Sequence, residues 1–280
     1  MRKILNSLVR IAIGVGIGIP LVLFPYFYFA QESLLFPAPF YDPAQNDLLP
    51  ALYSNAEEIR VTASDGVVLH GWLVKSGKAD GKMPMLIYFS GNSELADDFP
   101  IQQAALKDWG ILMINYRGYG KSEGKPSEQA LVADAVLLYD TLTKRTDVDT
   151  TRIVAMGRSL GSGVAVKLAH ERPLRAVILA TPYDSIRAVA QDMLPYIPVS
   201  IILKHPFDSL ALAPKINTPM LCLIAGDDTL IPPPHGKRLA KAWGGPTDVQ
   251  ILPGVDHDTI YGHPHLWRLV RDFLHRTAGS

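Results

Sequence analysis

The fold of this chain is decided by residues 152–166, whose sequence is RIVAMGRSLGSGVAV. An apolar run leads directly into the pattern Gly-x-Ser-x-Gly at residues 157–161, and a second apolar run with helical spacing follows. This order predicts a strand, a sharp turn and a helix, the arrangement called a nucleophile elbow, which holds a serine hydroxyl at the carboxyl edge of a sheet. Gly157 and Gly161 relieve the crowding that such a turn creates. The stretch therefore predicts that Ser159 is a nucleophile at the edge of a parallel sheet.

A second Gly-x-Ser-x-Gly pattern, at residues 120–124, lacks these surroundings. The segment Tyr116-Arg117-Gly118-Tyr119 precedes it in place of a continuous apolar strand, and Lys125-Pro126 follows in place of a helix. We therefore expect Ser122 to lie in a surface loop, with Ser127 capping the helix that comes next. Ser159 is the preferred nucleophile.

Strand and helix patterns alternate along the rest of the chain. Two segments flank the turn dipeptide Asp65-Gly66 and predict an antiparallel hairpin; they are Glu57–Ser64 and Val67–Lys75. Short apolar runs predict buried parallel strands at Met85–Phe89, Ile111–Tyr116, Arg152–Gly157, Arg175–Ala180, Met220–Ala225 and Val249–Leu252. Helical spacing occurs between them, at Leu95–Trp109, Ser127–Arg145, Leu160–Glu171, Pro234–Trp243 and His265–Arg276. The pattern predicts an α/β fold with a doubly wound, mostly parallel sheet.

One segment, residues 183–213, interrupts this alternation and is too short for an independent domain. It contains three prolines and a short apolar helix, and many of its residues are aliphatic, among them Ile186, Val189, Met193, Leu194, Ile197, Val199, Ile201, Ile202 and Leu203. We predict a small cap that roofs the site and lines a pocket for an acyl chain. Packing on the sheet or contact with a bilayer surface would explain the same composition, and both remain alternatives.

The composition excludes several classes of protein. The 280 residues carry 27 basic and 27 acidic side chains, 48% are apolar, and only Cys222 is a cysteine. The chain is therefore neither disordered nor a disulfide scaffold, and nucleic acid is not expected as a partner. No cluster of Cys, Asp or Glu with ligand spacing accompanies His263 and His265, so no metal and no cofactor is predicted.

The N-terminus carries a long uncharged run from Ile11 to Ala30. At about 1.5 Å per residue it would extend roughly 30 Å, the thickness of a bilayer core. Arg2, Lys3 and Arg10 precede the run, so we expect a cytoplasmic N-terminus and a domain on the outer, periplasmic or lumenal side. A cleaved signal peptide is the alternative, but Tyr28 occupies the position where a cleavage site needs a small residue.

These features divide the chain into four parts. A basic tail (residues 1–10) precedes a single-pass signal-anchor helix (residues 11–30), which is followed by a membrane-proximal segment (residues 31–56). The globular domain comprises residues 57–280 and includes the cap.

A serine nucleophile needs a base, and the base needs an orienting carboxylate. His257 follows a strand end and turn, Ile251–Asp256, that deliver it to the same edge as Ser159. Two adjacent acids, Asp227 and Asp228, follow the strand that ends at residue 225, and the residues by themselves leave the choice open. Solvated or capping roles are expected for the other late histidines, His235, His263, His265 and His275.

Four ordered motifs together resemble the α/β-hydrolase superfamily, in its N-terminally membrane-anchored, small-capped branch. They are Gly157–Gly161, Tyr116–Gly124, Asp228-Thr229-Leu230-Ile231-Pro232 and His257. In that family the acid precedes one residue, two aliphatic residues and a proline, which selects Asp228. The resemblance also implies an oxyanion hole formed by the backbone amides of Leu160 and Asn92, although Ser90-Gly91-Asn92-Ser93-Glu94 departs from the family's His-Gly-Asn loop.

The resemblance and the site residues together imply a membrane-anchored serine hydrolase that works through an acyl-enzyme, and the apolar character of the cap favours carboxylic esters or thioesters as its substrates. Its expected partners are a small-molecule or lipid-like acyl substrate and the membrane; the oligomeric state is not indicated. Two alternatives remain: an aminopeptidase-like amide hydrolase, and a catalytically silent membrane receptor or scaffold on the same fold. Superfamily members with dehalogenase or epoxide-hydrolase activity carry an aspartate at the elbow, which Ser159 argues against.

Overall fold

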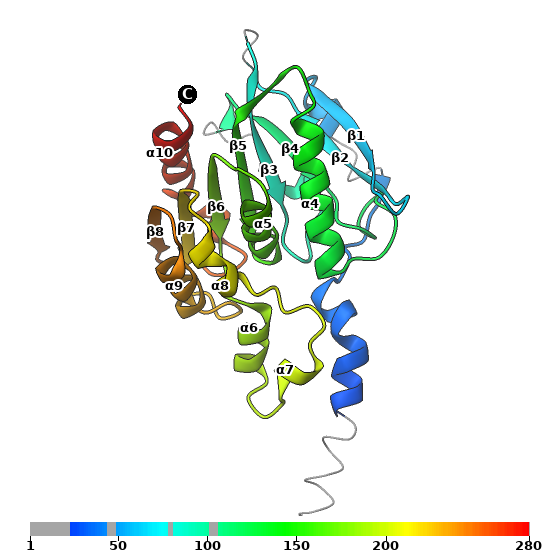
Figure 1. Ribbon diagram of the computed structural model, residues 1–280, viewed down its shortest axis with the longest axis vertical. Helices are drawn as coiled ribbons and strands as arrows, with labels where there is room; N and C mark the ends of the chain where they lie inside the picture. The colour runs from blue at the N-terminus through cyan, green and yellow to red at the C-terminus, as the bar shows by residue number, and fades with distance from the viewer. Residues whose placement is uncertain (1–22, 44–48, 78–80, 101–105, 280) are drawn as a thin grey trace, which may run out of the picture.

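A single eight-stranded sheet organises the protein. The computed structural model describes residues 23–43, 49–77, 81–100 and 106–279 (Figure 1). The strands lie in the order β1-β2-β4-β3-β5-β6-β7-β8. Their bounds are β1 Ala56–Thr62, β2 Val68–Val74, β3 Met83–Phe89, β4 Gly110–Ile114, β5 Val148–Arg158, β6 Ala176–Ala180, β7 Met220–Ala225 and β8 Thr247–Leu252.

The pairing of the strands confirms a mostly parallel sheet. β1 and β2 form the antiparallel hairpin, and β2 also pairs antiparallel with β4. Every pairing from β4 through β3 to β8 is parallel. The carboxyl ends of these six strands therefore meet at one edge, where ligands bind in open α/β sheets.

Helices cover both faces of the sheet, and each face has its own apolar core. α4 (Glu128–Leu142), α5 (Leu160–Glu171) and α9 (Pro233–Ala242) pack on one face. α10 (Leu266–Ala278) and the short α3 (Leu49–Leu52) pack on the other. In β3 the side chains alternate between the two cores, with Ile87 in the first and Leu86 in the second. Burial on both faces explains why the parallel strands are continuous apolar runs in the sequence.

The helix predicted at Leu95–Trp109 is wrong over its described part. The described residues there contain no α-helix: Ala96–Asp98 form the 3₁₀ turn η1, and Phe99 after it is extended with φ −66° and ψ 131°. Phe99 precedes Pro100, and the proline ring sterically disfavours the helical conformation of the residue before it. Phe99 instead packs into the second core.

The segment between β6 and β7 leaves the sheet and forms a small cap. It contains α6 (Ile186–Met193), α7 (Val199–Ile202) and α8 (Ser209–Leu212), followed by the 3₁₀ turn η3 (Ala213–Lys215). The cap therefore holds three short helices where the sequence predicted one. Ser185 caps α6 by accepting a hydrogen bond from the Ala188 amide at 3.0 Å.

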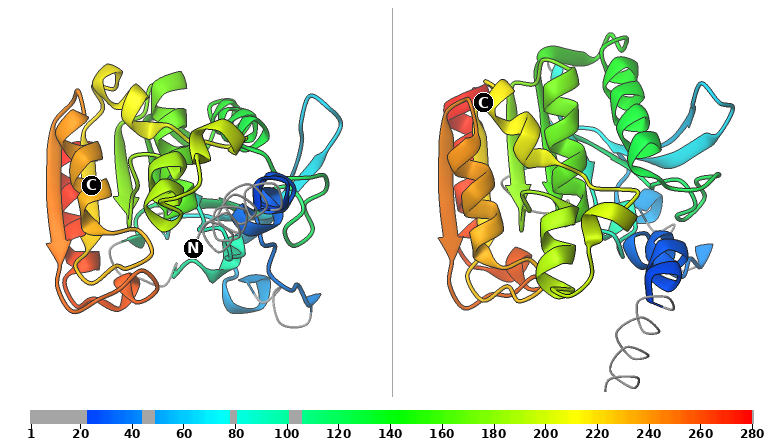
Figure 2. Two further views of the ribbon diagram at one scale, coloured as in Figure 1. Left: turned by 90° about the horizontal axis from the view of Figure 1, so that it is seen from below. Right: turned by 60° about the horizontal axis from the view of Figure 1, so that its bottom comes forward.

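An N-terminal helix of residues 23–35 lies beside the cap (Figure 2). It takes in the last residues of the predicted span Ile11–Ala30, while residues 11–22 lie outside the described part of the chain. Over the described ranges, none of the helices combines the length and the apolarity that crossing a bilayer requires. The transmembrane segment stays a prediction.

Candidate active site

Ser159 lies on a strained turn between β5 and α5. Its backbone has φ 50° and ψ −119°, a conformation that non-glycine residues rarely adopt and that costs about 1–3 kcal/mol. The turn is held by the Ser159 amide, which donates to the Ala180 carbonyl on the neighbouring strand at 3.0 Å. The strain keeps the hydroxyl at the carboxyl edge of the sheet.

The two glycines of the motif are required by close backbone contacts. A Cβ on Gly157 would lie 2.2 Å from the Gly161 carbonyl oxygen. A Cβ on Gly161 would lie 2.1 Å from the Phe89 carbonyl oxygen at the end of β3. Real Cβ atoms do not approach an oxygen this closely, so the elbow excludes any larger residue at either position.

The structure brings Ser159, His257 and Asp228 into one hydrogen-bonded chain. The Ser159 Oγ lies 2.9 Å from the Nε2 of His257, and the Nδ1 of that ring lies 2.8 Å from Asp228 Oδ2. All three residues are less than a tenth exposed. With the proton on Nδ1, the ring donates to the carboxylate and Nε2 can accept the serine proton, which is the geometry for activating a hydroxyl.

The structure also distinguishes the two adjacent acids. Asp228 is buried, and its Oδ1 accepts the amides of Leu230 and Ile231 at 2.9 and 2.8 Å, which leaves Oδ2 for His257. Asp227 is exposed and is held through its own amide, which donates to the Val255 carbonyl at 3.0 Å. Only Asp228 can orient the imidazole.

Leu160 and Asn92 both lie beside Ser159 on the wall of one cavity. Leu160 is the first residue of α5, and an amide at that position has no acceptor within its own helix. The backbone of Asn92 is held in place by the Tyr119 hydroxyl, which donates a hydrogen bond to the Asn92 carbonyl at 2.7 Å. Burial raises the pKa of Tyr119, so the phenol remains a donor. The Leu160 amide is therefore suited to stabilising an oxyanion, and the role of the Asn92 amide stays a prediction.

Glu94 and Arg158 connect the segment of Asn92, the elbow of Ser159 and the loop of His257. The sequence did not predict this role. Glu94 Oε2 accepts the Gly91 amide at 2.6 Å, and the same carboxylate forms an ion pair with Arg158. Arg158 in turn donates to the His257 carbonyl at 2.9 Å. Glu94, at which the loop departs from the family's pattern, is thus the ion-pair partner of Arg158, the residue before Ser159 in the Gly-x-Ser-x-Gly motif.

The predictions for Ser122 and His235 need correction, because both residues are buried. The Ser122 hydroxyl accepts the His70 amide and donates to the Asn115 carbonyl, each at 2.8 Å, so it joins two strand ends and is not in a surface loop. His235 forms a second histidine–aspartate pair, with its Nδ1 2.7 Å from Asp184 Oδ1. Burial alone would favour the neutral acid, but hydrogen bonds from His235 and from Arg238 lower the pKa of Asp184.

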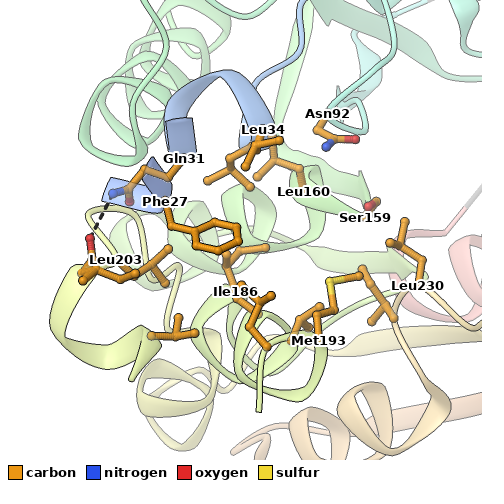
Figure 3. A pocket seen from close by; sticks show the side chains of 17 residues that line it. Phe27, Gln31, Leu34, Asn92, Ser159, Leu160, Ile186, Met193, Leu203 and Leu230 are labelled. Atoms are coloured by element: carbon orange, nitrogen blue, oxygen red, sulfur yellow. Dashed lines mark hydrogen bonds between the residues drawn. The ribbon is translucent and has the colours of Figure 1, made fainter. Parts of the chain in front are cut away.

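A cavity of about 450 Å³ opens beside Ser159 (Figure 3). Residues of the cap line it together with the N-terminal helix and the segment after β7. The described lining contains three polar residues, Gln31, Asn92 and Ser159, and no charged one. Its apolar members are Phe27, Leu34, Leu35, Leu160, Ile186, Val189, Ala190, Met193, Leu194, Val199, Ile202, Leu203, Leu230 and Ile231.

Other reactive groups offer no competing chemistry. Cys222 is buried in β7, and burial raises the pKa of its thiol to about 12, so it stays protonated. Within the ranges that the structure describes, no three His, Cys, Asp or Glu side chains are grouped to hold a metal ion. Among the described residues, Ser159 is therefore the best candidate for a nucleophile.

The chain is similar to a hydrolase family and to several known proteins. A family model described as serine aminopeptidase, S33, matches residues 89–206. An uncharacterized protein of Mycobacterium tuberculosis is 32% identical over 89% of this chain and 88% of its own length. The alpha/beta hydrolase domain-containing protein WAV2 of Arabidopsis thaliana is also 32% identical, over 79% of each chain.

A solved structure of an esterase from Pyrococcus furiosus shares the fold. Its TM-score is 0.68, it covers 86% of this chain and 97% of its own, and 18% of the aligned residues are identical. At that identity the likeness concerns the fold alone. The extent of the sequence identity to WAV2 carries the assignment, and the elbow at Ser159 and the strand order agree with it. The chain belongs to the α/β-hydrolase superfamily.

Proposed function

We propose that the protein is a serine hydrolase that cleaves esters or thioesters of apolar acyl groups. One observation carries the proposal: the hydrogen-bonded Ser159–His257–Asp228 chain opens onto a cavity whose described lining has no charge. A nucleophile beside an apolar pocket favours a substrate that places its acyl chain in the pocket and its scissile carbonyl at the serine.

In the proposed mechanism, Ser159 Oγ attacks the acyl carbon while His257 Nε2 takes the hydroxyl proton. Asp228 holds the ring and stabilises the imidazolium, and the Leu160 and Asn92 amides stabilise the oxyanion. His257 then gives its proton to the departing alcohol or thiol, leaving the acyl group on Ser159. Water, activated by the same ring, attacks the acyl-enzyme; the carboxylic acid departs and Ser159 regains its proton.

The alternative of an aminopeptidase, which the name of the family model suggests, has less support. Such an enzyme needs an acidic group for the cationic amino terminus of its substrate, and no acid is among the described lining residues. All three acids of the cap are paired: Asp184 and Asp192 lie at His235, at 2.7 and 3.1 Å, and Asp208 lies 2.5 Å from Arg187. A silent scaffold is also less favoured, because it would have no use for the backbone strain at Ser159.

The proposal is tested by comparing kcat/KM for p-nitrophenyl esters from acetate to palmitate, for matched thioesters, and for aminoacyl p-nitroanilides. We expect a medium-chain optimum among the esters. On the rising side each methylene should add about fourfold, because burying it contributes about 0.8 kcal/mol. A clear preference for the anilides would contradict the proposal.

We further propose that residues 11–30 anchor the protein in a membrane, with the active site outside the cytoplasm. The uncharged run and its basic flank support this. The cap and the N-terminal helix, which lie at one end of the molecule, also expose large apolar side chains, including Tyr196, Ile201 and Phe29. Such side chains are typical of a surface that faces lipid.

For the anchor, the expected result is that the full chain stays with the membrane fraction after an alkaline carbonate wash, because about twenty apolar residues insert stably. Protease added from the non-cytoplasmic side should digest the domain. Recovery of a soluble mature form that starts near residue 31 would refute the anchor.

A further inference from the structure

The helix of residues 23–35 turns one face toward the interior. Phe27, Gln31 and Leu35 are spaced four residues apart, lie on one side of the helix, and are buried or half-buried. Phe29, on another side, is 76% exposed. The three inward residues all line the cavity that reaches Ser159. The N-terminal helix is therefore a wall of this pocket.

Gln31 attaches the helix to the cap through both ends of its amide. Its Nε2 donates to the Ile202 carbonyl at 3.0 Å, and its Oε1 accepts the Lys204 amide at 2.7 Å. The Lys204 ammonium lies 3.1 Å from Glu32 Oε1. A buried amide that is satisfied by two backbone groups of a distant segment requires one relative position. The wall is thus held in place by specific contacts.

Phe27 is the largest side chain that this helix contributes to the cavity. In Figure 3 its ring points into the space among Leu34, Ile186 and Met193. Ser159 and Asn92 appear at one side of that view, and Gln31 and Leu203 at the other. A chain that extends from Ser159 into the cavity would meet this ring. The sequence places Phe27 in an aromatic cluster within the last residues of the predicted membrane span, but the structure directs it into the pocket.

We infer that residues 23–35 are part of the acyl-binding site and that Phe27 sets the length of acyl chain that the pocket accepts. This inference rests on the proposed serine hydrolase function. The side chains among which the ring points, Leu34, Ile186 and Met193, are apolar, so the bound group is a hydrocarbon chain. The end of the predicted span, residues 23–30, then belongs to the substrate site and not to the part that crosses the bilayer.

Phe27→Ala, in the full-length protein in detergent, is expected to shift the ester optimum toward longer chains. Removing the ring frees space for more of the acyl chain, and each methylene that enters raises kcat/KM about fourfold. For two extra methylenes, the ratio of kcat/KM for the laurate ester to that for the butyrate ester should rise roughly fifteenfold. Phe27→Trp should shift the optimum the opposite way, and it serves if Phe27→Ala does not fold.

Phe29→Ala is the matched control, because it makes the same change on the same helix at a side chain that does not line the cavity. Its chain-length profile should equal that of the unaltered protein. Thermal unfolding of each variant identifies any loss of folded protein. Identical profiles for Phe27→Ala, Phe27→Trp and Phe29→Ala would overturn the inference.

A binding measurement separates this inference from the proposed function. Fatty acids from butyrate to palmitate are titrated into Ser159→Ala protein, with and without Phe27→Ala, and Kd is measured by calorimetry. If the unaltered protein hydrolyses no ester but Phe27→Ala still moves the chain length at which Kd stops falling, the proposed function fails and the inference stands. If esters are hydrolysed and neither profile moves, the inference fails and the function stands.

Discussion

Ser159→Ala is expected to abolish labelling by a fluorophosphonate probe and to lower kcat for the best ester by roughly 10⁶-fold. Ser159 Oγ is the atom that His257 Nε2 faces at 2.9 Å, and alanine leaves the ring with nothing to activate. The loss should be in kcat, because the cavity proposed to bind the acyl chain remains. Gel-based labelling and steady-state kinetics on the purified full chain measure both effects.

Ser122→Ala is the control for this experiment, since Ser122 lies in the other Gly-x-Ser-x-Gly pattern. It should keep its labelling, but lose about 1–3 kcal/mol of unfolding free energy, because the buried His70 amide loses its acceptor. The two serines should therefore separate activity from stability. Folded Ser159→Ala protein that still takes up the probe would refute the assignment of the nucleophile.

Asp228→Asn is expected to lower kcat by roughly 10⁴-fold with little change in fold. The carboxylate receives the Nδ1 proton of His257 at 2.8 Å and thereby keeps Nε2 free to accept from Ser159. An asparagine can present its NH₂ group to Nδ1, which favours the tautomer with the proton on Nε2 and leaves no base facing the serine. The measurement is kcat for the best ester, with circular dichroism to verify folding.

Asp227→Asn is the matched variant one residue earlier, and we expect it to change kcat far less. Asp227 is exposed, and the contact that holds it uses its backbone amide, which the substitution leaves intact. A large loss in folded Asp227→Asn protein combined with near-normal Asp228→Asn activity would show that the wrong acid has been assigned.

The elbow and the sheet could be predicted from the sequence because they depend on local patterns. The continuous apolar run before residue 157 predicts a strand that is buried on both faces. Glycine occupies positions 157 and 161, where an added Cβ would lie about 2 Å from a backbone oxygen. His257 could be chosen because the turn that carries it follows a strand of the same sheet. The helix predicted at Leu95–Trp109 rested on apolar spacing alone. It does not form at Phe99, because Pro100 disfavours a helical conformation of the residue before it.

The sequence by itself thus predicted the fold class, from the alternation of strand and helix patterns along the chain, and it predicted the elbow serine and the histidine, each from the strand that comes just before it. The residues left the choice between Asp227 and Asp228 open; the resemblance selected Asp228, which the structure buries beside the ring. Only the tertiary structure showed that Glu94 and Arg158 connect the loops, and that Phe27 and Gln31 enclose the pocket. Gln31 meets Ile202 across 171 residues of chain, and Ser159 meets His257 across 98. No local pattern specifies such a contact, because it forms only when the sheet and the cap bring distant segments together.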